Sequence, residues 1–267
     1  MLEEALENRA VGLGVFVPPG DSMLMVNKYG QRVVNEKRNY NDRTRVHLVY
    51  DPSEAAFPNQ FLFMIYDQRC ADIFAGNFPF PHDAGAGRFI IQAATLADLA
   101  AKIDARLASL APKISSVRLA PAFADALDAS VARFNAFARA GKDADFHRGA
   151  SAYDREWDQV FGKRRQTSWG ENDLPNSTLY PLADKGPYYA IILAAGALDT
   201  NGGPLINERA QVLDADGRPI AGLYGAGNCI ACPSRSAYFG AGGTIGLALT
   251  FGYIAGKNGA AEPVREL

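Results

Sequence analysis

A run of glycines and aromatic residues at 236–256, SAYFGAGGTIGLALTFGYIAG, leads directly into an apolar helix pattern. Glycine inside a helix costs about 1 kcal/mol relative to alanine, so this composition needs a reason. Glycines just before a helix let another group approach the backbone, with the first N–H groups of the helix directed at it. The pattern therefore predicts either a ligand at this helix N-terminus or a close helix–sheet contact, and both remain open at this point.

The rest of the chain alternates strand and helix patterns. The dense apolar run at 61–67 predicts a buried strand. Residues 121–141 predict an amphipathic helix that ends at Gly141, and Thr95 is the expected N-cap of another helix. Further elements are expected at 23–36 (a hairpin), 188–195 (a strand), 210–227 (strands with a turn at 214–217) and 243–257 (a helix). A helix-rich middle between strand-bearing ends predicts an α+β protein of the α/β family, with the middle as a cap.

Composition narrows the function classes. A formal net charge of −2 gives no reason to expect nucleic acid or an anionic membrane as a partner. The acidic start of the chain is unlike a secretory signal, and no apolar run reaches the ~18–20 residues of a membrane span. Three cysteines, an odd number, argue against a disulfide framework. We therefore expect a cytoplasmic location, and the spacing of the three histidines predicts no metal site.

A charged segment at 35–43, NEKRNYNDR, follows the first expected strand. The pattern by itself favours a solvated charged loop. The alternative is chemical, because a tyrosine such as Tyr40 can accept or donate a proton when a neighbouring cation stabilises its anion. Arg38 and Arg43 are the candidate cations.

Two further glycine turns and a cysteine pair lie in the last third of the chain. GLYGAGN at 222–228 ends in Gly227 and Asn228, whose amide could bind sugar hydroxyls or only its own turn. DTNGG at 199–203 is equally ambiguous. Cys229 and Cys232 form a Cys-x-x-Cys, but Pro233 follows directly, so a redox role is the less favoured interpretation.

Taken together and in order, these pieces resemble the C-terminal portion of the FAD-dependent fumarate reductase and 3-ketosteroid dehydrogenase superfamily (the FAD-binding-2 type). LMVNKYGQRVVNE resembles the hairpin that enters the cap domain of the family, and GKDADFHRG resembles part of that cap. The stretch from GPYYAIILAAG to GLYGAGN is similar to the return into the FAD domain. YFGAGGTIGLALTFGYIAG resembles the closing helix that contacts the flavin.

The resemblance assigns roles to particular residues. It implies that Gly242 and the turn after it present backbone N–H groups to the pyrimidine edge of FAD, and that Tyr238 and the Gly242 N–H polarise a substrate ketone. It implies that Tyr40 takes a proton as hydride leaves for the flavin, with Arg43 or Arg38 as the alternative proton-transfer residue. The implied cofactor-binding residues are Gly227, Asn228, Gly243, Thr244 and Ile245.

Two departures from the family pattern matter. GALDTNGG has no histidine and YFGAGG has no arginine where the fumarate enzymes hold a dicarboxylate, which favours the ketosteroid branch. The Gly-x-Gly-x-x-Gly loop that binds the FAD pyrophosphate is also missing. We therefore expect a chain without the N-terminal Rossmann part: a tail or FAD-domain remnant at 1–21, a cap (catalytic) domain at 22–187 and the C-terminal lobe of an FAD-binding domain at 188–267.

The resemblance implies a part of an FAD-dependent oxidoreductase that dehydrogenates, or in reverse reduces, the bond beside a ketone of a hydrophobic, ketosteroid-like substrate. The alternative enzyme is a fumarate or tricarballylate-type reductase acting on carboxylates. The alternative from another class is a cofactor-free binding or assembly fragment, which the missing phosphate loop favours. The expected partners are a small ketone or carboxylate substrate and possible further copies of the chain.

Overall fold

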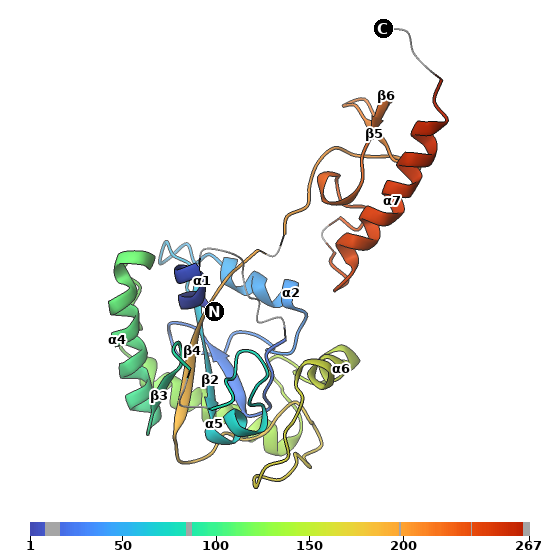
Figure 1. The fold of residues 1–267 in the computed structure, drawn as a ribbon. Helices are drawn as coiled ribbons and strands as arrows, with labels where there is room; N and C mark the ends of the chain where they lie inside the picture. The colour runs from blue at the N-terminus through green and yellow to red at the C-terminus, as the bar shows by residue number, and fades with distance from the viewer. Residues whose placement is uncertain (9–16, 84–86, 198, 236, 264–267) are drawn as a thin grey trace. The chain divides into compact units, whose positions relative to one another are not determined.

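The computed structural model describes residues 1–8, 17–83, 87–197, 199–235 and 237–263. These residues form two compact units, Met1–Gly196 and Ala197–Leu267, which are taken here one at a time (Figure 1). Both contain helices and strands, so the mixed helix and strand composition expected from the sequence is confirmed.

A four-stranded antiparallel sheet forms the centre of the first unit. Its strand order is β1 (Met23–Val26), β2 (Phe61–Asp67), β4 (Tyr188–Ala194) and β3 (Ile91–Ala93). The side chains of β2 are buried on both faces of the sheet, which explains its uninterrupted apolar sequence. Alternate residues face two separate clusters, with Phe63 in one and Met64 in the other.

Two long helices pack on the face of the sheet that contains Phe63. Helix α4 (Leu96–Ile114) begins as the sequence predicts, because the Asp98 N–H donates to Oγ1 of the N-cap Thr95. Helix α5 (Phe123–Ala140) buries its apolar stripe and ends at Gly141, whose φ of 68° is left-handed. The shorter helices of this unit are α1 (Leu2–Asn8), α2 (Tyr40–Thr44), η1 (Arg45–Leu48), α3 (Gln68–Ile73) and α6 (Ala152–Phe161).

The hairpin expected at 23–36 forms only in part. The turn is present, since the Asn27 N–H donates to the Gln31 carbonyl at 2.9 Å, but beyond it only an isolated bridge joins Arg32 to Val26. Strand β1 pairs with β2 instead. Beyond Arg32, the Glu36 carboxylate rather than a backbone carbonyl accepts the Met25 N–H of β1 at 3.1 Å, and the side chains of Asn35 and Lys37 bind α6.

The second unit holds a small hairpin and one long helix. Strands β5 (Gln211–Leu213) and β6 (Pro219–Tyr224) pair across the expected turn, where the Gly217 N–H donates to the Asp214 carbonyl at 3.1 Å. A 3₁₀ turn, η3 (Gly227–Cys229), then leads toward α7 (Gly243–Ala260). None of the described helices, α7 included, is both long and apolar enough to cross a membrane.

The first compact unit ends at Gly196. The reason is β4, which pairs with β2 and β3 and so belongs to the sheet of the first unit. The expected boundary at 187 between the cap and the FAD-binding domain stays a prediction, which this division does not test.

Candidate functional site

The charged segment at 35–43 is largely buried, so the interpretation as a solvated loop is wrong. Glu36 and Lys37 have no exposed surface, and Asn35 and Arg43 are only 5% and 6% exposed. Among the charged residues of this segment that precede Tyr40, only Arg38 is exposed. Burial of this many charges requires partners, and the structure supplies them from distant parts of the unit.

Glu36 lies at the centre of a buried ionic network. Its carboxylate accepts two hydrogen bonds from Arg32 at 2.8 Å each, one from Arg148 at 3.2 Å and one from the Met25 N–H at 3.1 Å. Burial alone would raise the pKa of Glu36, but the Arg32 and Arg148 guanidinium groups outweigh it and hold that pKa below its ordinary value. Glu36 is therefore a fixed anion.

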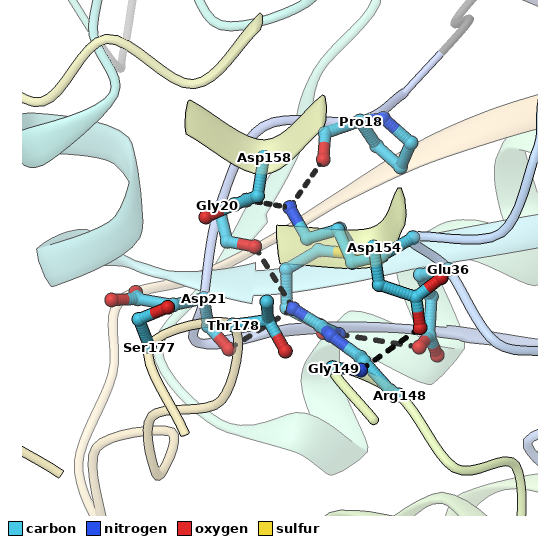
Figure 2. Close-up of polar contacts among 12 residues, drawn as sticks. Pro18, Gly20, Asp21, Glu36, Arg148, Gly149, Asp154, Asp158, Ser177 and Thr178 are labelled. Atoms are coloured by element: carbon cyan, nitrogen blue, oxygen red, sulfur yellow. Dashed lines mark hydrogen bonds and ion pairs between the residues drawn. The ribbon is translucent and has the colours of Figure 1, made fainter. Parts of the chain in front are cut away.

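Arg148 joins this network to the chain that enters β1. Figure 2 shows its guanidinium reaching the carbonyl groups of Gly20 and Asp21, at 2.9 and 3.4 Å, and a third bond goes to the Met23 carbonyl at 2.6 Å. The residues from Gly20 to Met23 are thus held from one side by a single side chain. Asp143 completes the network, because it accepts from Arg32 at 2.8 Å and from the Arg148 N–H at 3.1 Å.

Lys37 is held by two groups in the same region. Its Nζ donates to the Pro18 carbonyl at 2.6 Å and lies 2.5 Å from Asp158 Oδ1 of α6. Burial lowers the pKa of Lys37, and Asp158 acts against that change by favouring the charged form. A buried lysine of this kind depends on its carboxylate partner.

Tyr40 begins α2, immediately after these anchored residues. The N-cap of α2 is Asn39, whose side chain accepts the Asn41 N–H at 2.9 Å. Tyr40 is half-buried, and Arg43 follows it by three residues on the same helix. The Arg43 guanidinium donates to the Glu36 carbonyl at 3.0 Å, and burial lowers its pKa to about 10, against the opposing effect of Glu36. Arg43 is thus a buried cation three residues after Tyr40 in the sequence.

The second unit brings together the other predicted residues. Gly242 is the N-cap of α7 with φ of 91°, and it has no side chain to accept the N–H groups of Thr244 and Ile245. A Cβ placed on Gly242 would meet no described atom within 4 Å, so the space before the helix is open to a ligand. The Tyr238 ring lies 3.5 Å from the position of a Cβ on Gly243, which places this tyrosine beside the same helix start.

The two other glycine turns also meet in this unit. Gly227 has φ of 70° and lies against α7, since its Cβ position is 3.3 Å from Ala248 Cβ. The Asn228 amide donates to Asp199 at 3.0 Å, and the Asn228 carbonyl accepts the Gly202 N–H at 3.0 Å. DTNGG and GLYGAGN are therefore one local structure beside α7, a relation that separate motifs in the sequence do not reveal.

The cysteine pair is not arranged like a helical redox motif. Both thiols are free, and Ile230 between them is extended, with φ of −118° and ψ of 159°. Cys229 Sγ contacts the Ala226 carbonyl, whereas Cys232 Sγ contacts Ser234 Oγ. An extended spacer separates the two sulfurs, which does not favour a disulfide between them.

Sequence reasoning missed the residues that anchor the Tyr40 segment. These are Arg148, which lies in the GKDADFHRG stretch assigned to the cap by resemblance, and Asp154 and Asp158, for which no role was expected. Their one signal in the sequence is the density of charges of both signs in DFHRGASAYDREWD, which does not reveal that their partners, Asn35, Glu36 and Lys37, lie far earlier in the chain.

Known proteins resemble this chain over most of its length. The FAD binding domain family matches residues 9–245. The chain is 37% identical over 244 residues to a 4-oxocyclohexanecarboxylate 2-dehydrogenase of Sinomonas cyclohexanicum, covering 91% of this chain and 37% of that protein. It is also 37% identical over 244 residues to a 3-oxosteroid 1-dehydrogenase of Mycobacterium tuberculosis, covering 87% of this chain and 37% of that protein.

The fold agrees with these matches. A crystal structure of 3-ketosteroid delta1-dehydrogenase from Sterolibacterium denitrificans, in complex with 1,4-androstadiene-3,17-dione, superposes with a TM-score of 0.67 at 30% identity. The superposition covers 93% of this chain and 40% of that one. The chain therefore spans well under half the length of the relatives it matches. With the family match, this shows that the chain belongs to the FAD binding domain family of flavoproteins, whose cofactor is FAD.

Proposed function

We propose that this chain contributes to an FAD-dependent dehydrogenase that oxidises the carbon–carbon bond beside a ketone of a hydrophobic ring substrate. The observation that carries the proposal is the grouping of Tyr238, Gly242 and the open first turn of α7. It is supported by the names of the two relatives above, both dehydrogenases of cyclic oxo compounds.

The residues of the second unit fit the cofactor. A helix N-terminus carries about half a positive charge, which suits the flavin edge that becomes anionic on reduction. Thr244 and Ile245 would present N–H groups to that edge. Gly243, whose own N–H donates to the Gly240 carbonyl at 3.1 Å, would let the edge approach the backbone, while Gly227 and Asn228 would contact the sugar or ribityl chain. FAD, when bound, supplies the hydride acceptor.

The protein's own groups would perform the remaining chemistry. The Tyr238 hydroxyl and the Gly242 N–H would donate hydrogen bonds to the substrate ketone, which acidifies the neighbouring C–H bond. Tyr40 would accept that proton. Arg43, a buried cation three residues along α2, is the alternative proton-transfer residue. Arg38 is exposed, which makes it the weaker candidate for proton transfer.

Two finer assignments belong to the same proposal. Residues 22–187 would act as the cap and 188–267 as the C-terminal part of the FAD-binding domain, with β4 as the strand that joins them. The FAD pyrophosphate would be held by a Gly-x-Gly-x-x-Gly lobe that is not among these 267 residues, as the share of the relatives covered by this chain supports.

Flavin binding and substrate choice test the proposal in turn. The purified chain is mixed with FAD, desalted and examined for the visible flavin band, first alone and then joined to a dinucleotide-binding lobe of a relative. The flavin-loaded protein is then assayed with 3-oxosteroids, 4-oxocyclohexanecarboxylate and the dicarboxylates succinate and fumarate. We expect activity with the cyclic ketones; turnover of the dicarboxylates alone would overturn the proposal, and no flavin under either condition would favour a binding fragment.

One substitution distinguishes the catalytic contribution of the Tyr238 hydroxyl from general effects on folding. Tyr238→Phe removes only the hydroxyl, and loss of one hydrogen bond to a developing oxyanion typically lowers kcat about 10²-fold. We expect a fall of that order with flavin binding unchanged. An unchanged kcat/KM would remove Tyr238 from the mechanism.

A further inference from the structure

We propose that the buried ion pair between Lys37 and Asp158 is a positioning device for Tyr40, through which α6 fixes the backbone that enters α2. This inference rests on the proposed function, which makes Tyr40 the proton acceptor. It gives a role to Lys37, Asp158 and α6, none of which takes part in the proposed chemistry itself.

The first support is where the pair is attached. Lys37 precedes Tyr40 by three residues and is fully buried, with Nζ between the Pro18 carbonyl at 2.6 Å and Asp158 Oδ1 at 2.5 Å. Two fixed acceptors on different parts of the chain leave the lysine side chain little freedom to move. The backbone at Lys37 is therefore tied to α6 and to the segment before β1.

The second support is the unusual way in which α6 is held. Its two buried side chains are carboxylates, Asp154 and Asp158, whereas Val160 is 64% exposed and Phe161 is 39% exposed. Asp154 Oδ2 accepts from the Asn35 amide at 2.9 Å, so the two carboxylates, one turn apart, bind Asn35 and Lys37. A helix normally buries its apolar face, whereas the buried face of α6 binds the residues just before Tyr40 together with the Gly149 N–H, at 3.0 Å from Asp154, and Arg164, at 3.4 Å from Asp158.

The third support is that the segment between Lys37 and Tyr40 is short and closed by its own bonds. The Arg38 N–H donates to the Asn35 carbonyl at 3.1 Å, and the Arg43 N–H donates to the Asn39 carbonyl at 2.8 Å. Together with the Asn39 cap, these bonds restrict the backbone between Lys37 and Tyr40. A displacement of Lys37 would therefore also displace Tyr40.

The fourth support is energetic. A buried ion pair is often no more stable than two apolar side chains of similar volume, because both charges lose their hydration. Stability alone therefore does not require Lys37 and Asp158. The position of Tyr40 does require them, since displacement of a catalytic group by about 1 Å can lower the reaction rate about 10²-fold.

The test compares three variants in the flavin-loaded enzyme that contains this chain: Lys37→Met, Asp158→Asn and the double variant Lys37→Met with Asp158→Leu. We expect each single variant to lower kcat at least tenfold with KM unchanged, and to increase the deuterium isotope effect at the carbon that loses the proton. The double variant removes both charges of the pair, and Arg164, which lies 3.4 Å from Asp158, keeps Asp21 at 3.6 Å as a second partner. We therefore expect the double variant to recover the thermal stability of the wild type without recovering kcat.

The matched control is a second buried ion pair of the same unit. Arg69 lies 2.6 Å from Asp21, and both side chains are as buried as Lys37 and Asp158, but neither belongs to the segment before Tyr40. Arg69→Met should lower stability and leave kcat and the isotope effect at wild-type values. Equal losses of kcat in this control would show a general effect of buried charges and overturn the inference.

Tyr40→Phe distinguishes the proposed role of Tyr40 in proton transfer from the positioning role of the Lys37–Asp158 pair. If Tyr40→Phe keeps the wild-type kcat, the proposed function of Tyr40 fails. If Tyr40→Phe loses activity but the stable double variant has wild-type kcat, the positioning inference alone is overturned. A double variant whose KM rises in proportion to its loss of kcat would also overturn it, because that result indicates a disordered substrate site.

Discussion

Arg148 shows how a single residue can define the interior of the first unit. Its side chain has no exposed surface, and its terminal nitrogens bond to backbone carbonyls before β1 and to Glu36. Each of these oxygens would otherwise need another donor, because buried polar groups without partners are costly. Arg148 thus joins Glu36 and the segment from Gly20 to Met23 to a part of the chain at least 112 residues later.

Removal of this guanidinium should be strongly destabilising. Arg148→Met leaves Glu36 with fewer partners and several carbonyls without a donor, so we expect the free energy of unfolding to fall by about 3 kcal/mol or more. Both tryptophans, Trp157 and Trp169, lie in the first unit, so urea unfolding followed by their fluorescence measures it. Arg133→Met, at an exposed pair with Asp145, is the control and should leave stability nearly unchanged.

The same network predicts the response to acid. The pKa values of Asp21, Glu36 and Asp143 are all lowered, since nearby arginines outweigh the effect of burial. The folded state then binds fewer protons than the unfolded chain, so this contribution to stability is complete above about pH 5 and is lost progressively as the pH falls through about 4 toward the lowered pKa values of the folded state. Burial raises the pKa of Asp67, which acts in the opposite direction.

Urea unfolding between pH 7 and pH 3 measures this dependence. Glu36→Gln removes one of the titrating groups, so we expect its stability to change less steeply with pH below about 4 than that of the wild type. Parallel curves for the two proteins would contradict the assignment of acid sensitivity to Glu36.

At the scale of elements, local signals and long-range partners differ in what the sequence reveals. Helix α5, the cap at Thr95 and the turn at 214–217 were predictable, because each depends on residues within a few positions of one another. The buried state of Glu36 was not, because its partner Arg148 lies 112 residues away. The grouping of Tyr238 with Gly243 came from family resemblance, and the glycine pattern alone left it open.

The N-cap of α4 offers a prediction for one such local signal. Thr95→Ala removes the acceptor of the Asp98 N–H and should lower the free energy of unfolding by about 1 kcal/mol. Thr95→Ser keeps a hydroxyl at the same place and should lose much less. Equal losses in the two variants, measured by urea unfolding, would mean that the methyl group rather than the cap is responsible.

At the scale of the whole molecule, the second unit has an exposed apolar surface. Helix α7 has no buried side chain, and Ile245, Leu249 and Tyr253, spaced four apart on one face, are 65%, 71% and 72% exposed. Exposed patches of this kind commonly mark contacts with other protein surfaces. A flavin-binding lobe is the occupant that the proposed function supplies.

The isolated chain should therefore associate through this face of α7. We expect sedimentation velocity to show an average mass that rises with concentration, and Leu249→Lys to reduce that rise by placing a charge in the centre of the stripe. Lys102→Glu, on α4 of the first unit, is a surface control that should not reduce it. Identical association of the Leu249→Lys variant and the wild type would exclude this face.

Strand β4 has a consequence for how a gene encoding this protein can be divided. It lies between β2 and β3 although the chain reaches it only after the whole helical region, so the sheet closes last in order of synthesis. A shortened gene ending at codon 187 would leave both neighbouring strands with open edges, which promote aggregation. Recombination, natural or engineered, would have to carry the reading frame through Gly196 to keep the four-stranded sheet complete.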